Sequence, residues 1–408
     1  MMNPEKNKID IQLKNRSTIL RLLQAHEYAC RKDLAELSGL TAAAVTNLVR
    51  DLVDIGLVAE DRNYVGPRSR NAISLRINRD AFLVIGANFR RGRLACAVSN
   101  LGGKIIEKES VEFASDVTVE HVLQEICNVV TKMLSSDSLA RKVIGMGIGV
   151  PGPINVSRGQ IAHITNLPGW KQVPIRRLME ERFQIPVLIE HDANTAALAE
   201  KWFGVGKPYH DIVSLLVGKG VGAGIIANDK IYHGAAGFAG EIGHTSIDFD
   251  GFSCECGNRG CLELYTSTLV LLNRVKKELA IDSHLTIDQL RQVLDGGNDK
   301  AYAILMEIAT YLGYGVVNII NSYNPEIVIL GGEISLLGDR WLERIMNRVR
   351  EIVDTRVLPD VARDVQIEYS RLGNDSVLLG AVALVVDYLF DRPVLGYFDR
   401  SLARQPAR

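Results

Sequence analysis

The alternation of apolar and polar residues divides the chain into a helical first part and a longer part in which strands and helices alternate. In the first part, five apolar residues follow the i, i+3, i+4, i+7, i+8 spacing of a helical face, namely Val45, Leu48, Val49, Leu52 and Val53. Ser38-Gly39-Leu40 precedes this segment and Gly56 follows it, where a turn and a helix end are expected. A further apolar group at 19–23 predicts another helix upstream. The pattern therefore predicts helices joined by a tight turn, the last of them beginning at Thr41.

A polar stretch after these helices predicts a wing. Gly66 and Pro67 indicate a turn, Arg68 and Arg70 follow it, and 72–77 alternates like a strand. An arginine on a narrow loop between two strands suits insertion into a minor groove or binding of a phosphate.

From about residue 81 the pattern is that of an α/β protein, and it occurs twice. The first occurrence predicts a three-stranded meander followed by alternating helices and strands, at 82–88, 93–99, 104–109, 118–134, 143–150, 175–183, 187–190 and 193–203. The second begins near Ile212 and predicts strands at 212–217, 222–227, 230–232, 327–330 and 365–369. We expect two related α/β halves facing a cleft.

Composition and charge exclude several classes of protein. The 408 residues are 47% hydrophobic and 23% charged, typical of a globular protein of two or three domains. No uninterrupted apolar run suggests a membrane span, and the polar N-terminus is unlike a signal peptide, so we expect a cytoplasmic protein without membrane insertion. The net charge is −1, and residues 1–75 carry eleven Lys and Arg against nine Asp and Glu. A protein that coats nucleic acid by bulk charge is thereby disfavoured, and any DNA contact must use a focused surface.

The helix that begins at Thr41 has the character of a DNA recognition helix. Such a helix approaches the major groove closely, so its first exposed residues are small or hydrogen-bonding. The candidate contacts are Thr41, Ala42, Ala43, Thr46, Asn47 and Arg50, joined by Arg68 and Arg70 on the wing. Alanine can contact a thymine methyl group, and asparagine can read adenine. The alternative is a helical hairpin that only packs on the body; the arginine-bearing turn favours DNA binding.

Three of the six cysteines lie close together and predict a metal site. Cys254, Cys256 and Cys261 follow His244, and glycines at 257 and 260 allow the chain to turn sharply between them. Three thiolates and an imidazole form the tetrahedral set that structural Zn²⁺ prefers. A disulfide is disfavoured in a cytoplasmic protein, and three thiols without a role are the remaining alternative.

The segment Gly234 to His244, followed by the Cys-x-Cys-Gly-x-x-Gly-Cys-Leu-Glu element that ends at Glu263, resembles the ROK family of repressors, open reading frames and kinases. The resemblance covers essentially the whole chain and is strongest to the family's DNA-binding repressors. It implies a multidomain protein, with a mainly α winged helix-turn-helix at 1–78 and a two-lobed body at 79–408. The body would have an α/β, actin-like and hexokinase-like (ribonuclease H-like) fold, with the zinc site in its second lobe.

The resemblance also implies an effector site and partners. The sugar-binding residues would be Asn166, Asp192, Glu241, His244 and Glu263. The partners would be operator DNA, a sugar or sugar phosphate, a second copy in a homodimer or homotetramer and, as in some relatives, a sugar-transporter protein.

Kinase members of the family bind ATP phosphates through an Asp-x-Gly-Gly-Thr loop, which this chain lacks. The equivalent residues are Asn88-Phe89-Arg90-Arg91-Gly92, in which arginines replace glycines that would allow close approach to phosphate. A second glycine loop carries Lys219 where threonine is usual, whereas the adenosine-side segment 327–333 matches the family. We therefore expect a sugar-responsive transcriptional regulator, a repressor, of carbohydrate uptake or catabolism genes. The alternative is an ATP-dependent sugar kinase (for a hexose or an N-acetylhexosamine), with Asp192 as its general base, that has kept a DNA-binding head.

Overall fold

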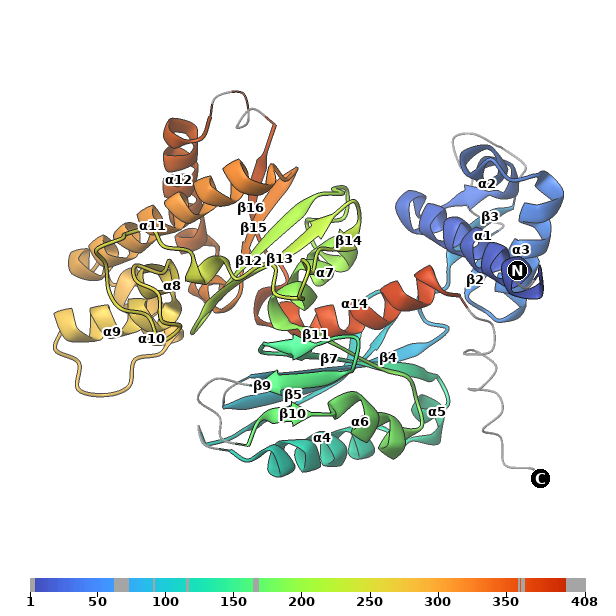
Figure 1. The fold of residues 1–408 in the computed structure, drawn as a ribbon, viewed down its shortest axis with the longest axis horizontal. Coiled ribbons are helices and arrows are strands. Elements are labelled where there is room, and N and C mark those ends of the chain that lie inside the picture. Colours follow the sequence, from blue (N-terminus) through green and yellow to red (C-terminus); the bar gives the residue numbers. More distant parts are fainter. Residues whose placement is uncertain are drawn as a thin grey trace. The chain divides into compact units, whose positions relative to one another are not determined.

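The computed structural model describes residues 4–61, 73–90, 92–114, 117–163, 169–358, 360 and 364–393 (Figure 1). The chain forms two compact units. The first consists of Met1–Val150, Ser157–Ile189 and Ala381–Arg408, and the second of Pro151–Val156 and Glu190–Gly380. Each is described by itself below.

The N-terminal part of the first unit folds as three helices and a small sheet. The helices are α1 (Pro4–His26), α2 (Arg31–Ser38) and α3 (Ala42–Asp54), and the sheet has the order β1 (Ala29–Cys30), β3 (Ser74–Ile77), β2 (Val58–Asp61). Gly39, with φ +68°, ends α2, and the Thr41 hydroxyl caps α3 by accepting from the Ala44 N–H. These are the two helices and the tight turn that the sequence predicts. The tip of the predicted wing lies outside the described residues.

Both units contain a five-stranded sheet with the same connectivity. In the first unit the sheet has the order β11-β7-β4-β5-β6, formed by β4 (Leu83–Arg90), β5 (Arg93–Asn100), β6 (Ile105–Glu112), β7 (Val143–Val150) and β11 (Val187–His191). In the second the order is β14-β13-β12-β15-β16, formed by β12 (Ile212–Val217), β13 (Val221–Ala227), β14 (Lys230–Ile231), β15 (Ile327–Gly331) and β16 (Gln366–Tyr369). In each, the first three strands form an antiparallel meander and the fourth pairs parallel with the first. The predicted internal repeat is therefore confirmed.

The remaining elements surround these sheets. In the first unit they are α4 (Val119–Met133), α5 (Asp137–Ala140), α6 (Ile175–Phe183) and the antiparallel pair β9 (Gln160–His163) and β10 (Lys171–Val173). In the second they are β8 (Ile154–Asn155), α7 (Asp192–Phe203), η1 (Ile242–His244), α8 (Glu263–Thr266), α9 (Thr268–Glu278), α10 (Ile287–Asp295), α11 (Asp299–Tyr323), η2 (Glu333–Leu337), α12 (Asp339–Arg356) and η3 (Gly373–Asp375). Helix α14 (Ser376–Asp391) begins in the second unit and ends in the first. The short strands β8 to β10 were not predicted, because segments of two to four residues carry no clear periodicity.

The alternation of side chains along β13 decides what packs on each face of the second sheet. Val221, Ala223 and Ile225 face a large apolar core that also includes residues of α9 to α12. Gly222 and Gly224 point the other way, and a Cβ on Gly224 would lie 2.2 Å from the Ala193 carbonyl oxygen of α7. Glycine is required there because the backbone of α7 lies directly on the strand. This contact positions the first residues of α7.

Two helical segments are long and apolar enough to cross a membrane by length and composition alone, although neither is an uninterrupted apolar run. Helix α11 and the segment Gly373–Asp391 meet the length and composition criteria, with 56% and 67% of their apolar windows buried inside the protein. Ile308, Leu312 and Ile320 of α11 are fully buried in the core of the second unit. Their hydrophobicity is therefore accounted for by packing within the fold.

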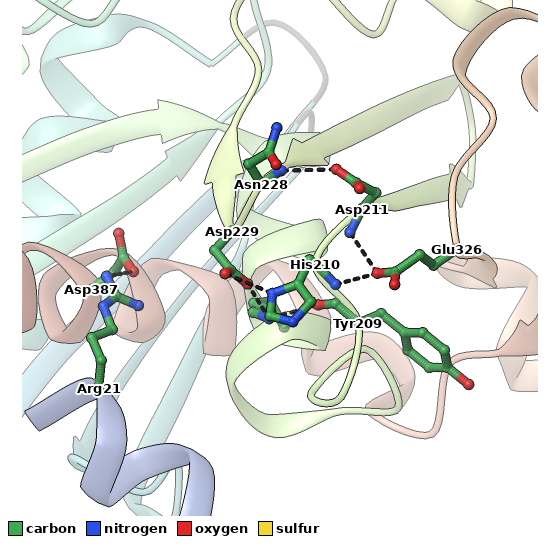
Figure 2. Close-up of polar contacts among 9 residues, drawn as sticks. Arg21, Tyr209, His210, Asp211, Asn228, Asp229, Glu326 and Asp387 are labelled. Atoms are coloured by element: carbon green, nitrogen blue, oxygen red, sulfur yellow. Dashed lines mark hydrogen bonds and ion pairs between the residues drawn. The ribbon is translucent and has the colours of Figure 1, made fainter. Parts of the chain in front are cut away.

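Within the first unit, an ion-pair cluster joins α1 to the end of α14. The Arg21 guanidinium lies 2.8 Å from Asp387 (Figure 2). It also lies 2.7 Å from Asp391. All three side chains are partly exposed, so the free energy gained is modest, on the order of 1 kcal/mol or less per pair.

Candidate functional site

Several of the predicted effector residues converge on the beginning of β13. The Val221 N–H donates to Glu263 Oε2 at 2.8 Å. The carbonyl group of the same residue is in close contact with Gly243, where a Cβ would lie 2.0 Å from the Val221 carbonyl oxygen. Glu263 and the segment that carries His244 are thus both anchored on Val221.

The glycine-rich segment before His244 lies flat against β13. The Ala223 N–H donates to the Gly240 carbonyl at 2.9 Å. Gly240 has φ +97°, and a Cβ there would lie 2.0 Å from the Ala223 carbonyl oxygen. Only glycine meets both constraints. Glu241 follows directly and its side chain is exposed, so the segment presents this carboxylate at the surface of the second unit.

Asp192 is the first residue of α7, the helix that packs on Gly222 and Gly224 of β13. Its Oδ1 accepts from the Ala193 N–H at 2.7 Å and lies 3.5 Å from His191 Nδ1. The side chain is 24% exposed, so it remains accessible to a ligand. The structure therefore packs the segments that carry Asp192, Glu241, His244 and Glu263 against one strand, β13, of the second unit. Asn166 lies outside the described residues.

Two residues of this region were missed by the sequence analysis. Glu190 is 2% exposed, yet its carboxylate accepts from the His191 N–H at 2.8 Å and from Asn194 Nδ2 at 3.0 Å. Its other oxygen lies 2.7 Å from His233 Nε2. This hydrogen bond raises the pKa of His233 above its usual value. The signal available in the sequence was a lone acidic residue at the end of an apolar strand, Val187-Leu188-Ile189-Glu190.

Acidic side chains flank the second glycine loop, Gly218-Lys219-Gly220. The Thr268 hydroxyl donates to Glu333 Oε2 at 2.6 Å, and the Thr268 N–H donates to the Gly218 carbonyl at 2.8 Å. A Cβ on Gly220 would lie 2.8 Å from Glu263 Oε2. Two carboxylates, those of Glu263 and Glu333, therefore stand beside this loop, which itself carries the exposed Lys219. The sequence analysis took Glu333 as part of an intact segment and missed this placement.

The hairpin in place of the first phosphate loop is a regular continuation of β4 and β5. The two strands stay paired as far as Arg90 and Arg93. Asn88 Nδ2 donates to the Gly149 carbonyl of β7 at 3.2 Å, and Phe89 stacks on Trp170 with the ring centroids 4.6 Å apart. Arg91 lies outside the described residues. The side chains of Asn88 and Phe89 thus have packing and hydrogen-bonding roles within the first unit.

The predicted metal ligands are gathered at one point. The ligand atoms of His244, Cys254, Cys256 and Cys261 all lie within 4.8 Å of one another. Cys256 Sγ and Cys261 Sγ are 3.7 Å apart, as are Cys254 Sγ and His244 Nδ1. Tetrahedral zinc with Zn–S bonds of about 2.3 Å would separate two sulfurs by about 3.8 Å. The donor set therefore fits a tetrahedral ion in both chemistry and spacing.

The backbone around the cysteines explains this convergence. Cys254 N–H donates to the Asn258 carbonyl at 2.8 Å, which closes a tight loop through Gly257, where φ is +93°. A Cβ on Gly260 would lie 1.7 Å from the Asp248 carbonyl oxygen. Burial raises the pKa of the Cys261 thiol to about 12, and a bound cation is the partner that brings such a sulfur to the thiolate form at neutral pH.

The candidate DNA-contacting residues of the recognition helix share one exposed face. Val45, Leu48 and Val49 are buried, whereas the predicted contacts are all exposed: Thr41, Ala42, Ala43, Thr46, Asn47 and Arg50. Arg16 of α1 pairs with Asp51 at 2.9 Å and so ties α1 to the second half of α3. Arg68 and Arg70 lie outside the described residues.

Comparison with known proteins gives matches to two family models. The model of the ROK family matches residues 85–388, and that of winged helix-turn-helix DNA-binding domains matches residues 13–59. The chain is 32% identical to the xylose repressor of Caldicellulosiruptor bescii over 93% of this chain and 97% of the repressor. It is also 33% identical to the glucokinase of Halalkalibacterium halodurans, over 74% of this chain and 94% of the kinase.

Among solved structures, the chain is similar to a ROK family transcriptional regulator described as a homolog of the Escherichia coli Mlc protein. The TM-score is 0.80 at 24% identity, and the match covers 96% of this chain and 100% of that one. The likeness extends over the helical N-terminal part as well as the body, so the fold expected from the sequence is confirmed.

We expect Cys256→Ser to abolish metal binding at this cluster. Three remaining ligands hold a divalent ion far more weakly than four, so metal content measured by plasma mass spectrometry after gel filtration should fall from about one ion per chain to a small fraction. Cys127→Ser is the matched control, because Cys127 lies apart from the cluster. A fully loaded Cys256→Ser protein would contradict the ligand assignment.

Proposed function

We propose, from the premise that this chain belongs to the ROK family, that it is a sugar-responsive repressor that binds operator DNA through residues 1–78 and senses its effector through residues 79–408. The observation that carries this proposal is the exposed polar face of α3, in a chain similar over almost its whole length to a named xylose repressor. Regulation of carbohydrate uptake or catabolism genes follows from the same similarity. A regulator of this kind acts in the cytoplasm.

The effector site would be formed by Asp192, Glu241, His244 and Glu263, with Asn166. Carboxylates and imidazole can each hydrogen-bond a pair of sugar hydroxyls. His244 could serve both as a metal ligand and as a sugar-binding residue. Its Nδ1 faces Cys254 Sγ in the candidate metal site, and its Nε2 would be the nitrogen that binds a sugar hydroxyl. Three carboxylates around β13 favour a neutral sugar over a sugar phosphate, because a phosphate would bring like charge to the site.

The metal would be zinc with a structural role, since four protein ligands leave no open position for a substrate. Its ligands His244 and Cys261 stand at the two ends of the segment between Glu241 and Glu263. The ion would therefore fix the spacing of these two carboxylates on β13 without contacting the effector.

A sugar kinase is the second candidate, and the similarity to a glucokinase together with the accessible Asp192 favours it. Asp192 could accept a proton from a sugar hydroxyl as a general base. Against it stand Glu263 and Glu333 beside the second glycine loop, and the regular hairpin in place of the first. These features disfavour binding of ATP phosphates, so the sensor accounts for more of the structure than the kinase does.

We expect a thermal-shift panel to separate the two candidates. The ligands are D-xylose, D-glucose, N-acetyl-D-glucosamine, their phosphates, and ATP with Mg²⁺. A ligand at about 100 times its dissociation constant adds about 2.7 kcal/mol to the free energy of unfolding. We expect stabilisation by one neutral sugar and none by ATP with Mg²⁺, and the same sugar should weaken DNA binding, since it binds one conformation more tightly. A shift with ATP followed by turnover would support the kinase, and a panel without any shift would direct the search to a transporter protein.

We expect Arg50→Ala to weaken DNA binding at least tenfold, because one phosphate or base contact of arginine contributes about 1–3 kcal/mol. The measurement is fluorescence anisotropy at fixed salt on a duplex that the unaltered protein selects from a random-sequence pool. Arg141→Ala is the control, because Arg141 is also exposed but lies at the end of α5. Equal weakening in the two variants would argue against α3 as the recognition helix.

The two half-sites of an operator require two copies of the chain, and we infer that they associate through a surface beside the metal loop. A groove of about 990 Å³ there is lined by Phe252, Tyr265 and Tyr311, with the Arg274–Glu307 ion pair at its side. Phe249, in the same loop, is 84% exposed. In a two-fold symmetric contact, each copy must present both a projecting side chain and the groove that receives it. Here Phe249 of each copy would insert into the groove of the other.

We expect the double variant Phe249→Ala, Phe252→Ala to sediment as a monomer at micromolar concentration, where the unaltered protein sediments as a dimer or tetramer. Loss of two aromatic anchors removes the residue type that dominates such interfaces. Ile106→Ala, an exposed apolar residue of β6, is the control. Unchanged sedimentation of the double variant would place the interface elsewhere.

A further inference from the structure

The Glu190–His233 pair connects the two segments that carry the proposed effector residues. Glu190 lies two residues before Asp192, at the end of β11. His233 follows β14 and begins the glycine-rich segment, whose Ala239 N–H donates back to the His233 carbonyl at 3.1 Å. A single side-chain contact of 2.7 Å thus joins the turn before Asp192 to the loop before Glu241.

The carboxylate of Glu190 needs this partner. A buried carboxylate has lost its hydration and must be compensated by hydrogen bonds or by an opposite charge. The His191 N–H and Asn194 Nδ2 both donate to Oε1, and His233 is the residue that the structure places against Oε2. His233 supplies a positive charge when it is protonated, and a charge-assisted hydrogen bond is roughly twice as strong as a neutral one.

We propose that Glu190 and His233 are positioning residues that hold Asp192 and the Gly234–Glu241 loop in the geometry required for effector binding. This inference rests on the proposed sugar site. Neither side chain needs to contact the sugar. Their contribution would be to reduce the motion of the loop, and hence the ordering that the effector must impose when it binds.

The charge state of His233 gives the pair a pH dependence. The hydrogen bond to Glu190 raises the pKa of His233 in the folded protein. The stabilisation is therefore fully present below the unfolded value of about 6.5, and it is lost as the pH rises through the raised value. Glu190 is the charged group in contact with His233. His191 and Asp192 follow Glu190 in the chain and lie 3.5 Å from each other.

The chain offers a matched control in a second histidine–carboxylate pair. His210 Nδ1 lies 2.7 Å from Asp229 Oδ2, in a polar cluster near the other end of β12 and β13 (Figure 2). Glu326 accepts from the Asp211 N–H in the same cluster. His210 is exposed, and none of the proposed effector residues belongs to its cluster. Replacing His210 therefore tests for general effects of losing a histidine–carboxylate pair.

The experiment compares His233→Gln, His233→Arg and His210→Gln with the unaltered full-length protein. The first readout needs no ligand: hydrogen exchange of the peptide segment 233–241 by mass spectrometry at pH 6 and pH 8.5, corrected for intrinsic exchange. We expect His233→Gln to raise the exchange rate about tenfold at pH 6, the effect expected from losing one charge-assisted hydrogen bond. His233→Arg, which stays charged, should keep the segment protected at both pH values, and His210→Gln should behave like the unaltered protein.

The second readout is calorimetric titration with D-xylose, chosen from the name of the similar repressor. His233→Gln should bind it about tenfold more weakly, because one charge-assisted hydrogen bond is lost, whereas His233→Arg should bind it with an affinity independent of pH. Unaltered exchange and unaltered affinity in His233→Gln would overturn the inference. If the unaltered protein does not bind D-xylose but exchange follows the expected pattern, the positioning role stands and this effector is excluded.

Discussion

The second unit depends on the close approach of glycine backbones to β13. Gly240 and Gly243 lie against the carbonyl groups of Ala223 and Val221 with no room for a Cβ, and Gly224 allows α7 to lie equally close. Two segments distant in sequence, the glycine-rich segment and α7, therefore share β13 as their common support. Any side chain at these glycines would have to push a segment away, because β13 is held in place by its pairing with β12.

The polar contacts around this support are arranged so that each acidic group has a defined partner. Glu263 accepts from the Val221 N–H, Glu333 from the Thr268 hydroxyl, and Glu190 from three donors. Buried or half-buried carboxylates are costly unless they are satisfied in this way. The same arrangement that orders the proposed sugar site also places two carboxylates beside the glycine loop.

The two sheets show how a duplicated fold can differ in function between its halves. Their connectivity is identical, yet the meander of the first unit ends in a regular hairpin with Phe89 stacked on Trp170, whereas that of the second carries glycines and acidic neighbours. The shared sheets together with these differences suit a body that binds a sugar and signals to a DNA-binding head.

The sequence by itself determined what depends on local periodicity and short spacing. The β7, α6 and β12 boundaries agree with the structure, the metal ligands converge because they lie within 18 residues, and the exposed face of α3 follows from its 3.6-residue period. Only the tertiary structure decided which distant groups meet. Glu190 and His233 are 43 residues apart, and Thr268 and Glu333 are 65 apart. No local pattern encodes such pairs, because they are formed by the order of strands in the sheet and by the glycines that let separate segments approach β13.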